Sequence, residues 1–142
     1  MKPLNQVVNE WIRMSGRFLL DTNIIIALFG DDASVKNRLA HADEVFISST
    51  VLGELYFGAH KSKHVKKNLS RLEDFASCSA VLPCDTDTAS VYGLIKKRLL
   101  EKGKPIPEND IWIAAVAYQH GLTVISRDDH FSEVENLNFE TW

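Results

Sequence analysis

The sequence contains little cysteine and no long apolar run. Only Cys78 and Cys84 carry thiols among 142 residues, and their spacing matches no metal-binding pattern. No apolar stretch approaches the roughly 20 residues that a membrane-spanning helix needs, and the N-terminus lacks the apolar core of a secretory signal. These absences argue against a membrane protein and against an exported domain held together by disulfides. We therefore expect a cytoplasmic protein whose two cysteines are reduced.

A histidine- or cysteine-based metal site is also missing from the sequence. Four of the histidines do not make up a complete zinc-ligand set: His41, His60, His64 and His120. Zinc sites place such ligands at short, regular intervals, so zinc is not expected. A single histidine such as His130 is more often a surface or packing residue than a ligand, and we predict that role for it.

The composition is that of one globular domain, with 45% hydrophobic and 25% charged residues. The net charge of −3 hides an uneven distribution, because residues 61–71 and 96–104 hold five basic residues each, of 16 Lys and Arg in all. Two interpretations stay open: solvated helix faces, or a surface that follows nucleic-acid phosphates. The candidate phosphate contacts are Lys61, Lys63, Lys66, Lys67, Lys96 and Lys97.

Apolar strand-like and helix-like segments alternate along the chain. We predict strands at 18–20, 45–47, 80–82, 122–125 and 138–140. Between them we predict helices over 24–29, 34–41 (capped by Ser34), 51–59, 63–76, from 85 or 86 to 103, and from a cap at 109 or 110 to 120. This order predicts an α/β fold with a parallel sheet covered on both faces. The working site of such a sheet lies beyond the carboxyl ends of its strands.

Four acids occupy positions that this topology brings to one edge. Asp21 interrupts the apolar run FLLDTNIIIALF directly after the first strand, and Asp128 follows the fourth strand. Glu54 lies early in the helix after the second strand, and Asp110 begins a helix that is apolar nearly all round. Converging carboxylates repel one another, and a hard divalent cation such as Mg²⁺ or Mn²⁺ resolves that repulsion. The sequence therefore indicates an acidic metal site.

Each acid also has a structural explanation. Asp21 and Asp110 are good helix caps, which does not exclude metal binding. Glu54 could instead form an ion pair with a lysine. The sequence alone does not separate Asp128 from Asp129; we prefer Asp128 because it is nearer the strand end, and we expect Asp129 to be solvated.

Three small polar residues flank the predicted strand ends: Thr22, Asn23 and Ser126. Such side chains orient carboxylates and water molecules around a metal. Ordinary turn and cap chemistry explains them equally well.

Three segments, taken in order, resemble a PIN domain of the VapC type, the toxin half of bacterial and archaeal toxin–antitoxin pairs: LLDTNIIIALF, SSTVLGELYFGAH and KGKPIPENDIWIAAVAYQHGLTVISRDDHF. The resemblance covers about residues 17–142, so residues 1–16 are either an N-terminal extension or an upstream start. It implies a three-layer α/β/α fold around a mostly parallel five-stranded sheet.

The resemblance also implies a Mg²⁺- or Mn²⁺-dependent endoribonuclease that hydrolyses RNA phosphodiester bonds and inhibits growth. It assigns the acidic site to Asp21, Glu54, Asp110 and Asp128, with Asp21, Asp110 and Asp128 as metal ligands. Thr22 and Ser126 match the family's hydroxyl positions beside those acids. The implied partners are a second copy of the chain and a VapB-type antitoxin whose C-terminal segment lies over the active-site groove. Operator DNA would be contacted only through the antitoxin, and no membrane is involved.

Three other functions compete with this interpretation. A structure-specific DNA nuclease of the same fold would use the same acids. A non-catalytic PIN module in a DNA-binding complex is typically marked by loss of acids, whereas all four are present here. A phosphoacceptor receiver domain needs adjacent acids near the first strand and a late lysine, and the sequence around Asp21 and Asp128 provides neither.

Overall fold

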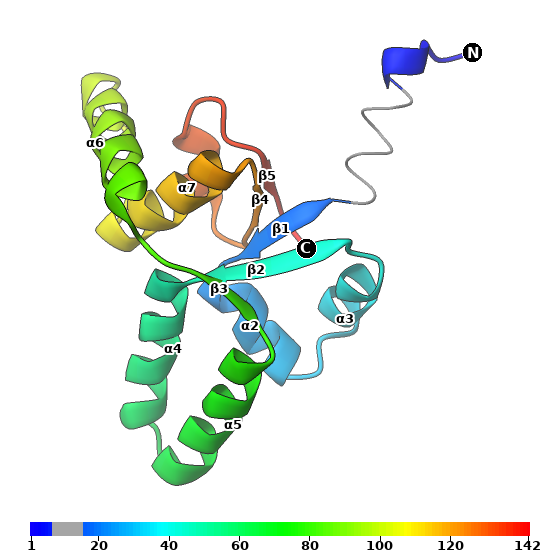
Figure 1. Ribbon diagram of the computed structural model, residues 1–142, viewed down its shortest axis with the longest axis vertical. Helices are drawn as coiled ribbons and strands as arrows, with labels where there is room; N and C mark the ends of the chain where they lie inside the picture. Colours follow the sequence, from blue (N-terminus) through cyan, green and yellow to red (C-terminus); the bar gives the residue numbers. More distant parts are fainter. Residues whose placement is uncertain (7–15) are drawn as a thin grey trace.

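The computed structural model describes residues 1–6 and 16–142, and its centre is a five-stranded sheet (Figure 1). The strand order is β3-β2-β1-β4-β5, and every pairing is parallel. The strands are β1 (Arg17–Leu20), β2 (Glu44–Ser48), β3 (Ala80–Leu82), β4 (Thr123–Ile125) and β5 (Phe139–Glu140). The predicted α/β class is confirmed, and the sheet is parallel throughout rather than mostly so.

Helices cover both faces of the sheet, which gives the three layers. Figure 1 shows α6 and α7 on one side and α2, α4 and α5 on the other. The helices are α2 (Thr22–Phe29), α3 (Ala33–Ala40), α4 (Ser49–His60), α5 (Val65–Ser77), α6 (Thr86–Glu101) and α7 (Glu108–His120), with the 3₁₀ helix η1 (Asp129–Glu133). The helices change from one face of the sheet to the other because the chain first adds strands on one side of β1 and then on the other. Right-handed crossovers in these two directions lie on opposite faces.

The strand order reverses at β1, which pairs with β2 on one side and β4 on the other. Leu20 is in register with Ile125, so the residues that follow them emerge side by side. The backbone N–H of Asp21 donates to the carbonyl oxygen of Ile125 at 2.9 Å, which extends the ladder by one residue. The crevice of this sheet therefore opens beside Asp21 and Ser126.

The apolar core lies on both faces of the sheet, against α7 on one face and against α2 and α4 on the other. Five consecutive residues of α7, from Ile113 to Ala117, are buried, which confirms the prediction of a buried helix. Gly121 ends this helix in the left-handed conformation at φ 65°. Because glycine has no Cβ, it adopts that conformation without strain.

Two helix caps differ from the predictions. Asp32, not Ser34, caps α3, and its side chain accepts a hydrogen bond from the N–H of Val35 at 3.1 Å. Helix α7 begins at Glu108 after Pro107, so Asp110 is not a cap but lies inside the first turn. The fixed φ of proline explains this earlier start, since it suits the residue that leads into a helix. The carboxylate of Asp110 is therefore free of a capping role.

Residues 7–15 lie outside the described residues, and the predicted N-terminal extension and its apolar residues fall largely there. Cys78 and Cys84 are both free and exposed. Among the helices of the described residues, none has the length and hydropathy needed to cross a membrane.

Candidate active site

Asp21 is a buried carboxylate at the junction of β1 and α2, with only 6% of its surface exposed. One oxygen, Oδ1, accepts from the N–H of Thr22 at 2.8 Å, and Oδ2 accepts from the hydroxyl of Ser126 at 2.7 Å. Burial raises the pKa of Asp21, and repulsion from other acids adds to this, whereas the two hydrogen bonds oppose it. Asp21 is thus both a helix cap and a carboxylate whose charge is incompletely compensated.

Ser126 is the centre of a small hydrogen-bond network and is fully buried. Its Oγ donates to Asp21 and accepts from Asn23 Nδ2 at 3.2 Å and from the N–H of Asp128 at 3.0 Å. Asn23 Oδ1 in turn accepts from the N–H of Arg127 at 3.1 Å. With one donor and two acceptor positions filled, the hydroxyl can point its proton only at Asp21. The network ties the end of β1 to the end of β4.

Glu54 approaches the same edge from α4. Its Oε1 accepts from the hydroxyl of Thr22 at 3.2 Å. Burial raises the pKa of Glu54, and the charges of Asp21 and Asp110 raise it further. Within the part of the chain that the structure describes, no cation lies within ion-pair distance of Glu54, so the alternative of a lysine partner is not found.

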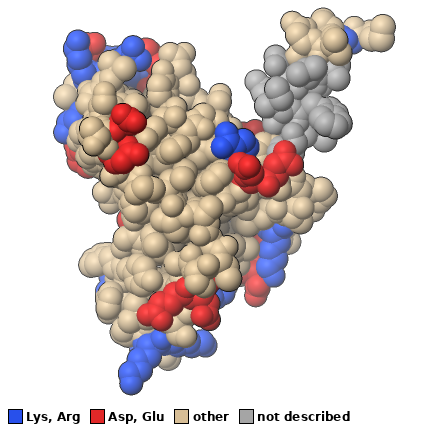
Figure 2. Space-filling view, viewed as in Figure 1, with Lys and Arg blue, Asp and Glu red and all other residues tan. Residues whose placement is uncertain are grey.

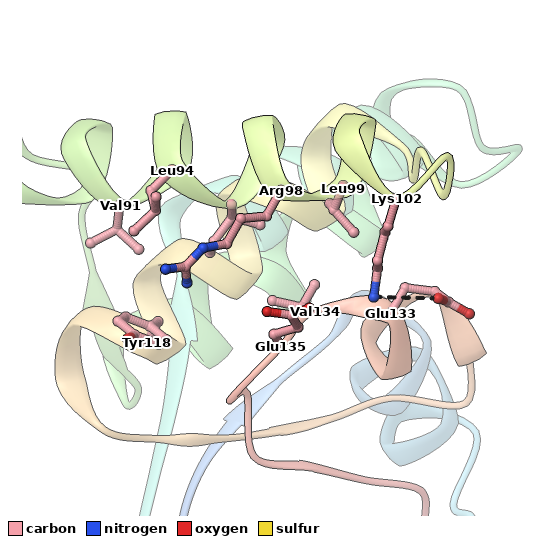
Figure 3. Close-up of a pocket in the computed structure, with 10 residues that line it drawn as sticks. Val91, Leu94, Arg98, Leu99, Lys102, Tyr118, Glu133, Val134 and Glu135 are labelled. Carbon is pink, nitrogen blue, oxygen red and sulfur yellow. Dashed lines mark ion pairs between the residues drawn. The ribbon is translucent and has the colours of Figure 1, made fainter.

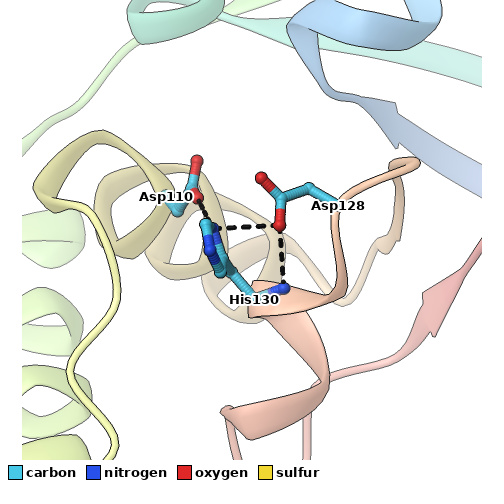
Figure 4. A group of neighbouring side chains, drawn as sticks. All are labelled: Asp110, Asp128 and His130. Carbon is cyan, nitrogen blue, oxygen red and sulfur yellow. Dashed lines mark hydrogen bonds and ion pairs between the residues drawn. The ribbon is translucent and has the colours of Figure 1, made fainter.

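Asp110, Asp128 and His130 form a cluster in which the histidine ring lies between the two carboxylates (Figure 4). His130 Nδ1 is 2.9 Å from Asp110 Oδ2 and 3.0 Å from Asp128 Oδ1. The backbone N–H of His130 also donates to Asp128 Oδ1 at 3.1 Å. Burial raises the pKa of Asp110, and the bond to Asp110 raises the pKa of His130.

The position of His130 was not anticipated from the sequence, which favoured a surface or packing role. The available signal was its place two residues after Asp128 at a strand end. Helix η1 turns the chain so that the ring reaches Asp110 on α7. Asp128 is half-buried and belongs to this cluster, whereas Asp129 is exposed. The choice of Asp128 over Asp129 as a site residue stays a prediction.

A groove of about 280 Å³ begins at Thr22 and Glu54 and continues between α2, α4 and α5. Most of its other lining residues are apolar: Ile26, Phe29, Leu55, Gly58, Ala59 and Leu72, with Asn68 and Arg71 at its polar side. The guanidinium of Arg71 lies 4.4 Å from the ring centre of Phe29 and donates to the Phe29 carbonyl oxygen at 2.7 Å. The groove therefore joins Glu54 to an apolar surface that carries one cation, Arg71.

A second hollow lies between α6, α7 and the segment after η1 (Figure 3). Its volume is about 10 Å³, which is room for one water molecule. At its edge, Glu133 Oε2 lies 3.7 Å from Lys102 Nζ, so these two charges form an ion pair with each other. This hollow is a packing seam rather than a ligand site.

The candidate phosphate contacts fall into two groups. Lys61, Lys63, Lys66 and Lys67 are exposed around the tip where α4 leads into α5, and Figure 2 shows basic atoms gathered there. On α6, Lys96 pairs with Glu108 at 2.5 Å and Lys97 with Glu101 at 3.5 Å. Figure 2 shows basic and acidic atoms mixed at the free end of α6. The α6 lysines are therefore largely neutralised by their own neighbours.

The donor set fits a hard divalent cation. Asp21, Glu54 and Asp110 have raised pKa values through burial first and through the charges of neighbouring acids second. Carboxylate oxygens are the ligands that Mg²⁺ and Mn²⁺ prefer, and a cation would remove the repulsion among them.

Comparison with known proteins agrees with this geometry. A model of the PIN domain matches residues 18–137. Ribonuclease VapC2 of Haemophilus influenzae is 36% identical over 129 residues, which cover 89% of this chain and 98% of that protein. The tRNA(fMet)-specific endonuclease VapC of Shigella flexneri shows the same identity over the same shares of both chains.

Solved structures show the same similarity. The DNA-bound VapBC from Salmonella typhimurium matches with a TM-score of 0.82 and 33% identity, over 89% of this chain and 98% of that chain. VapBC2 from Rickettsia felis, bound to a DNA fragment from its promoter, matches with a TM-score of 0.81 and 31% identity, over 88% and 98%. On this evidence the chain belongs to the PIN-domain family, and within that family to the group of the VapC ribonucleases.

Proposed function

We propose that this chain is a metal-dependent endoribonuclease and the toxin of a VapBC-type toxin–antitoxin pair. The observation that carries the proposal is the convergence of four carboxylates at the topological switch point of a parallel sheet. The raised pKa values of three of these carboxylates support it, because acids with shifted pKa values in a cleft are typical of functional sites. The similarity to proteins named ribonuclease VapC supports the choice of RNA as substrate.

Asp21, Asp110 and Asp128 would hold Mg²⁺ or Mn²⁺. When bound, such a cation stabilises the negative charge that develops on a phosphate under attack. Thr22 orients Glu54, whose raised pKa suits a base that accepts a proton from the attacking water. The water oxygen bonds to phosphorus, the bond from phosphorus to the 3′-oxygen breaks, and that oxygen takes a proton from solvent. The product keeps a 5′-phosphate.

The lysines at the α4–α5 tip are the proposed contacts to the RNA backbone. Lys66 and Lys67 are exposed there, and no ion pair to either is present among the described residues. Because each phosphate contact releases counterions, RNA affinity should fall as salt rises. Lys96 and Lys97 are weaker candidates, since each has an acidic neighbour on the protein itself.

The groove beside Glu54 is the proposed seat of the C-terminal segment of a VapB-type antitoxin. Its apolar lining suits an apolar peptide, and Glu54 at its end suits one basic side chain of that peptide. Several similar structures are VapBC complexes, which supports an antitoxin as partner. A homodimer, and contact with operator DNA only through the antitoxin, complete the proposal.

The testing experiment is cleavage of a panel of structured RNAs and matched DNAs by the purified chain. Reactions contain Mg²⁺, Mn²⁺ or chelator, and they compare the wild type with Asp21→Asn and with Asp129→Asn as a matched control on an exposed acid. We expect metal-dependent RNA cleavage that Asp21→Asn abolishes and Asp129→Asn retains. Cleavage of DNA alone would replace this proposal with the DNA nuclease. Metal binding without cleavage of any RNA in the panel would favour a non-catalytic module.

The RNA surface has its own test. Replacing Lys66 and Lys67 together by Ala should weaken RNA binding and flatten its salt dependence, while metal affinity stays unchanged. The matched control is the double Ala variant of Lys96 and Lys97, whose ion pairs predict a smaller effect. Equal binding by wild type and the Lys66/Lys67 variant would remove the tip from the RNA surface.

A further inference from the structure

His130 presents a ring nitrogen to two of the carboxylates of the candidate active site. Its Nδ1 and one oxygen each of Asp110 and Asp128 all lie within 4.8 Å of one another (Figure 4). The three groups come from different elements: Asp110 from α7, Asp128 from the end of β4, and His130 from η1. The fold, not a local turn alone, therefore brings a nitrogen donor into an oxygen-rich cluster.

The spacing of these atoms matches neighbouring ligands on one cation. Metal–ligand bonds of about 2.1 Å in an octahedral site place adjacent ligands about 3.0 Å apart. The two distances from His130 Nδ1 are 2.9 Å and 3.0 Å. As a simple donor, by contrast, the single N–H of a neutral ring would be shared between two acceptors, and each bond would be weakened.

The surroundings hold the ring in this position. The backbone N–H of His130 donates to Asp128 Oδ1, which fixes the turn that carries the ring. The other ring nitrogen, Nε2, has no hydrogen-bond partner among residues 1–6 and 16–142. A ring that carries its proton on Nε2 would offer the Nδ1 lone pair to the space between the two acids.

We propose that His130 Nδ1 is a nitrogen ligand of the cation held by Asp110 and Asp128, and that it biases the site toward Mn²⁺ over Mg²⁺. Mn²⁺ prefers carboxylate oxygens as Mg²⁺ does, but as a transition-metal ion it accepts an imidazole nitrogen more readily than Mg²⁺. A site with acids alone would discriminate less between these two ions. This inference rests on the proposed metal-dependent function, and it adds a specificity-determining residue to the four acids.

The test uses Mn²⁺ itself as a spectroscopic probe. Electron spin echo envelope modulation of the Mn²⁺-loaded chain detects nitrogen bound to the ion, and ¹⁵N-histidine labelling assigns that signal to a histidine. The variants are His130→Ala and, as a matched control, His41→Ala. His41 is also exposed, and its Nδ1 lies 2.8 Å from the carbonyl oxygen of Asn37. Asn37 belongs to α3, which carries none of the four acids of the candidate active site.

We expect a histidine nitrogen signal in the wild type and in His41→Ala, and its loss in His130→Ala. Calorimetric titration should show Mn²⁺ affinity falling by about tenfold or more in His130→Ala, with a smaller change for Mg²⁺. Circular dichroism checks that the variants are folded, and the 45% exposure of the His130 side chain favours a folded variant.

The possible outcomes distinguish failure of the His130 ligand role from failure of the proposed metal site. Mn²⁺ that binds through Asp110 but shows no nitrogen signal would overturn the ligand role and leave the metal site standing. Tighter Mn²⁺ binding by His130→Ala would also overturn it, because the ring would then be a competitor of the cation. Mn²⁺ binding that is unchanged in Asp110→Asn and in Asp21→Asn would remove both the inference and the proposed metal site.

Discussion

Replacing Ser126 by Ala tests how the carboxylate of Asp21 is held. The Ser126 hydroxyl makes three hydrogen bonds inside the protein: one donated to Asp21, and two accepted from Asn23 and from the backbone of Asp128. The bond to the ionised carboxylate carries most of the cost of the change, because Asp21 is only 6% exposed and water cannot replace the lost donor. A hydrogen bond to a charged group contributes about 1.5–3 kcal/mol, and a neutral one about 1 kcal/mol. Asn23 and Asp128 are half-buried, so water can accept part of the hydrogen bonding that they lose with the Ser126 hydroxyl.

We therefore expect Ser126→Ala to lower the free energy of unfolding by about 2–4 kcal/mol in chelator. The assay is urea unfolding followed by circular dichroism. Ser48→Ala is the matched control, because Ser48 is also fully buried at a strand end but makes a single capping bond, to the N–H of Val51 at 3.2 Å. Loss of that cap predicts that Ser48→Ala lowers the free energy of unfolding by about 1 kcal/mol.

Metal provides the second comparison for the same pair of variants. A cation that compensates the charge of Asp21 should make the stability loss of Ser126→Ala, relative to wild type, smaller in saturating Mn²⁺ than in chelator. The stability loss of Ser48→Ala should be the same in both conditions. Equal losses for the two variants in chelator would refute the assignment of Ser126 as the main support of Asp21. A Ser126→Ala deficit that does not change with Mn²⁺ would separate Asp21 from the metal.

The remaining predictions concern charge, metal and backbone conformation. Because burial raises the folded-state pKa of Asp21 above its unfolded value, the cost of its ionised form is present at neutral pH and vanishes as pH falls below the unfolded value. The stability of Asp21→Asn relative to wild type in chelator should therefore decrease from about pH 7 to about pH 4, and a flat difference in urea melts would contradict this. Mn²⁺ at about 100 times its dissociation constant should stabilise the wild type by about 2.7 kcal/mol and Asp110→Asn by much less, as measured by thermal unfolding. Gly121→Ala should lower the free energy of unfolding by about 1 kcal/mol because φ is positive at this residue. Gly93 lies in a helix with open space around it, so Gly93→Ala should raise the free energy of unfolding by a few tenths to about 1 kcal/mol. Equal decreases for the two variants would refute the backbone explanation.

Much of the fold was predictable because its signals are local. Alternating apolar segments predict the parallel sheet, and the all-apolar stretch of α7 predicts a helix buried on every side. The start of α3 was less predictable, because Asp32 and Ser34 both have capping side chains and only the backbone path selects Asp32. Pro107 moved the start of α7 upstream of the two polar residues that looked like caps, and this leaves Asp110 available to the site.

The sequence by itself determined which acids stand at strand ends and helix starts, because those positions follow from hydrophobic periodicity and cap chemistry. Only the tertiary structure decided which groups meet. The contact of His130 with Asp110 joins residues from α7 and η1, and the network around Ser126 joins residues more than 100 positions apart along the chain. The pairing of Lys96 with Glu108 likewise depends on how α6 packs beside α7. Such contacts depend on distances between elements, and these are set by the packing of the whole core rather than by any local pattern.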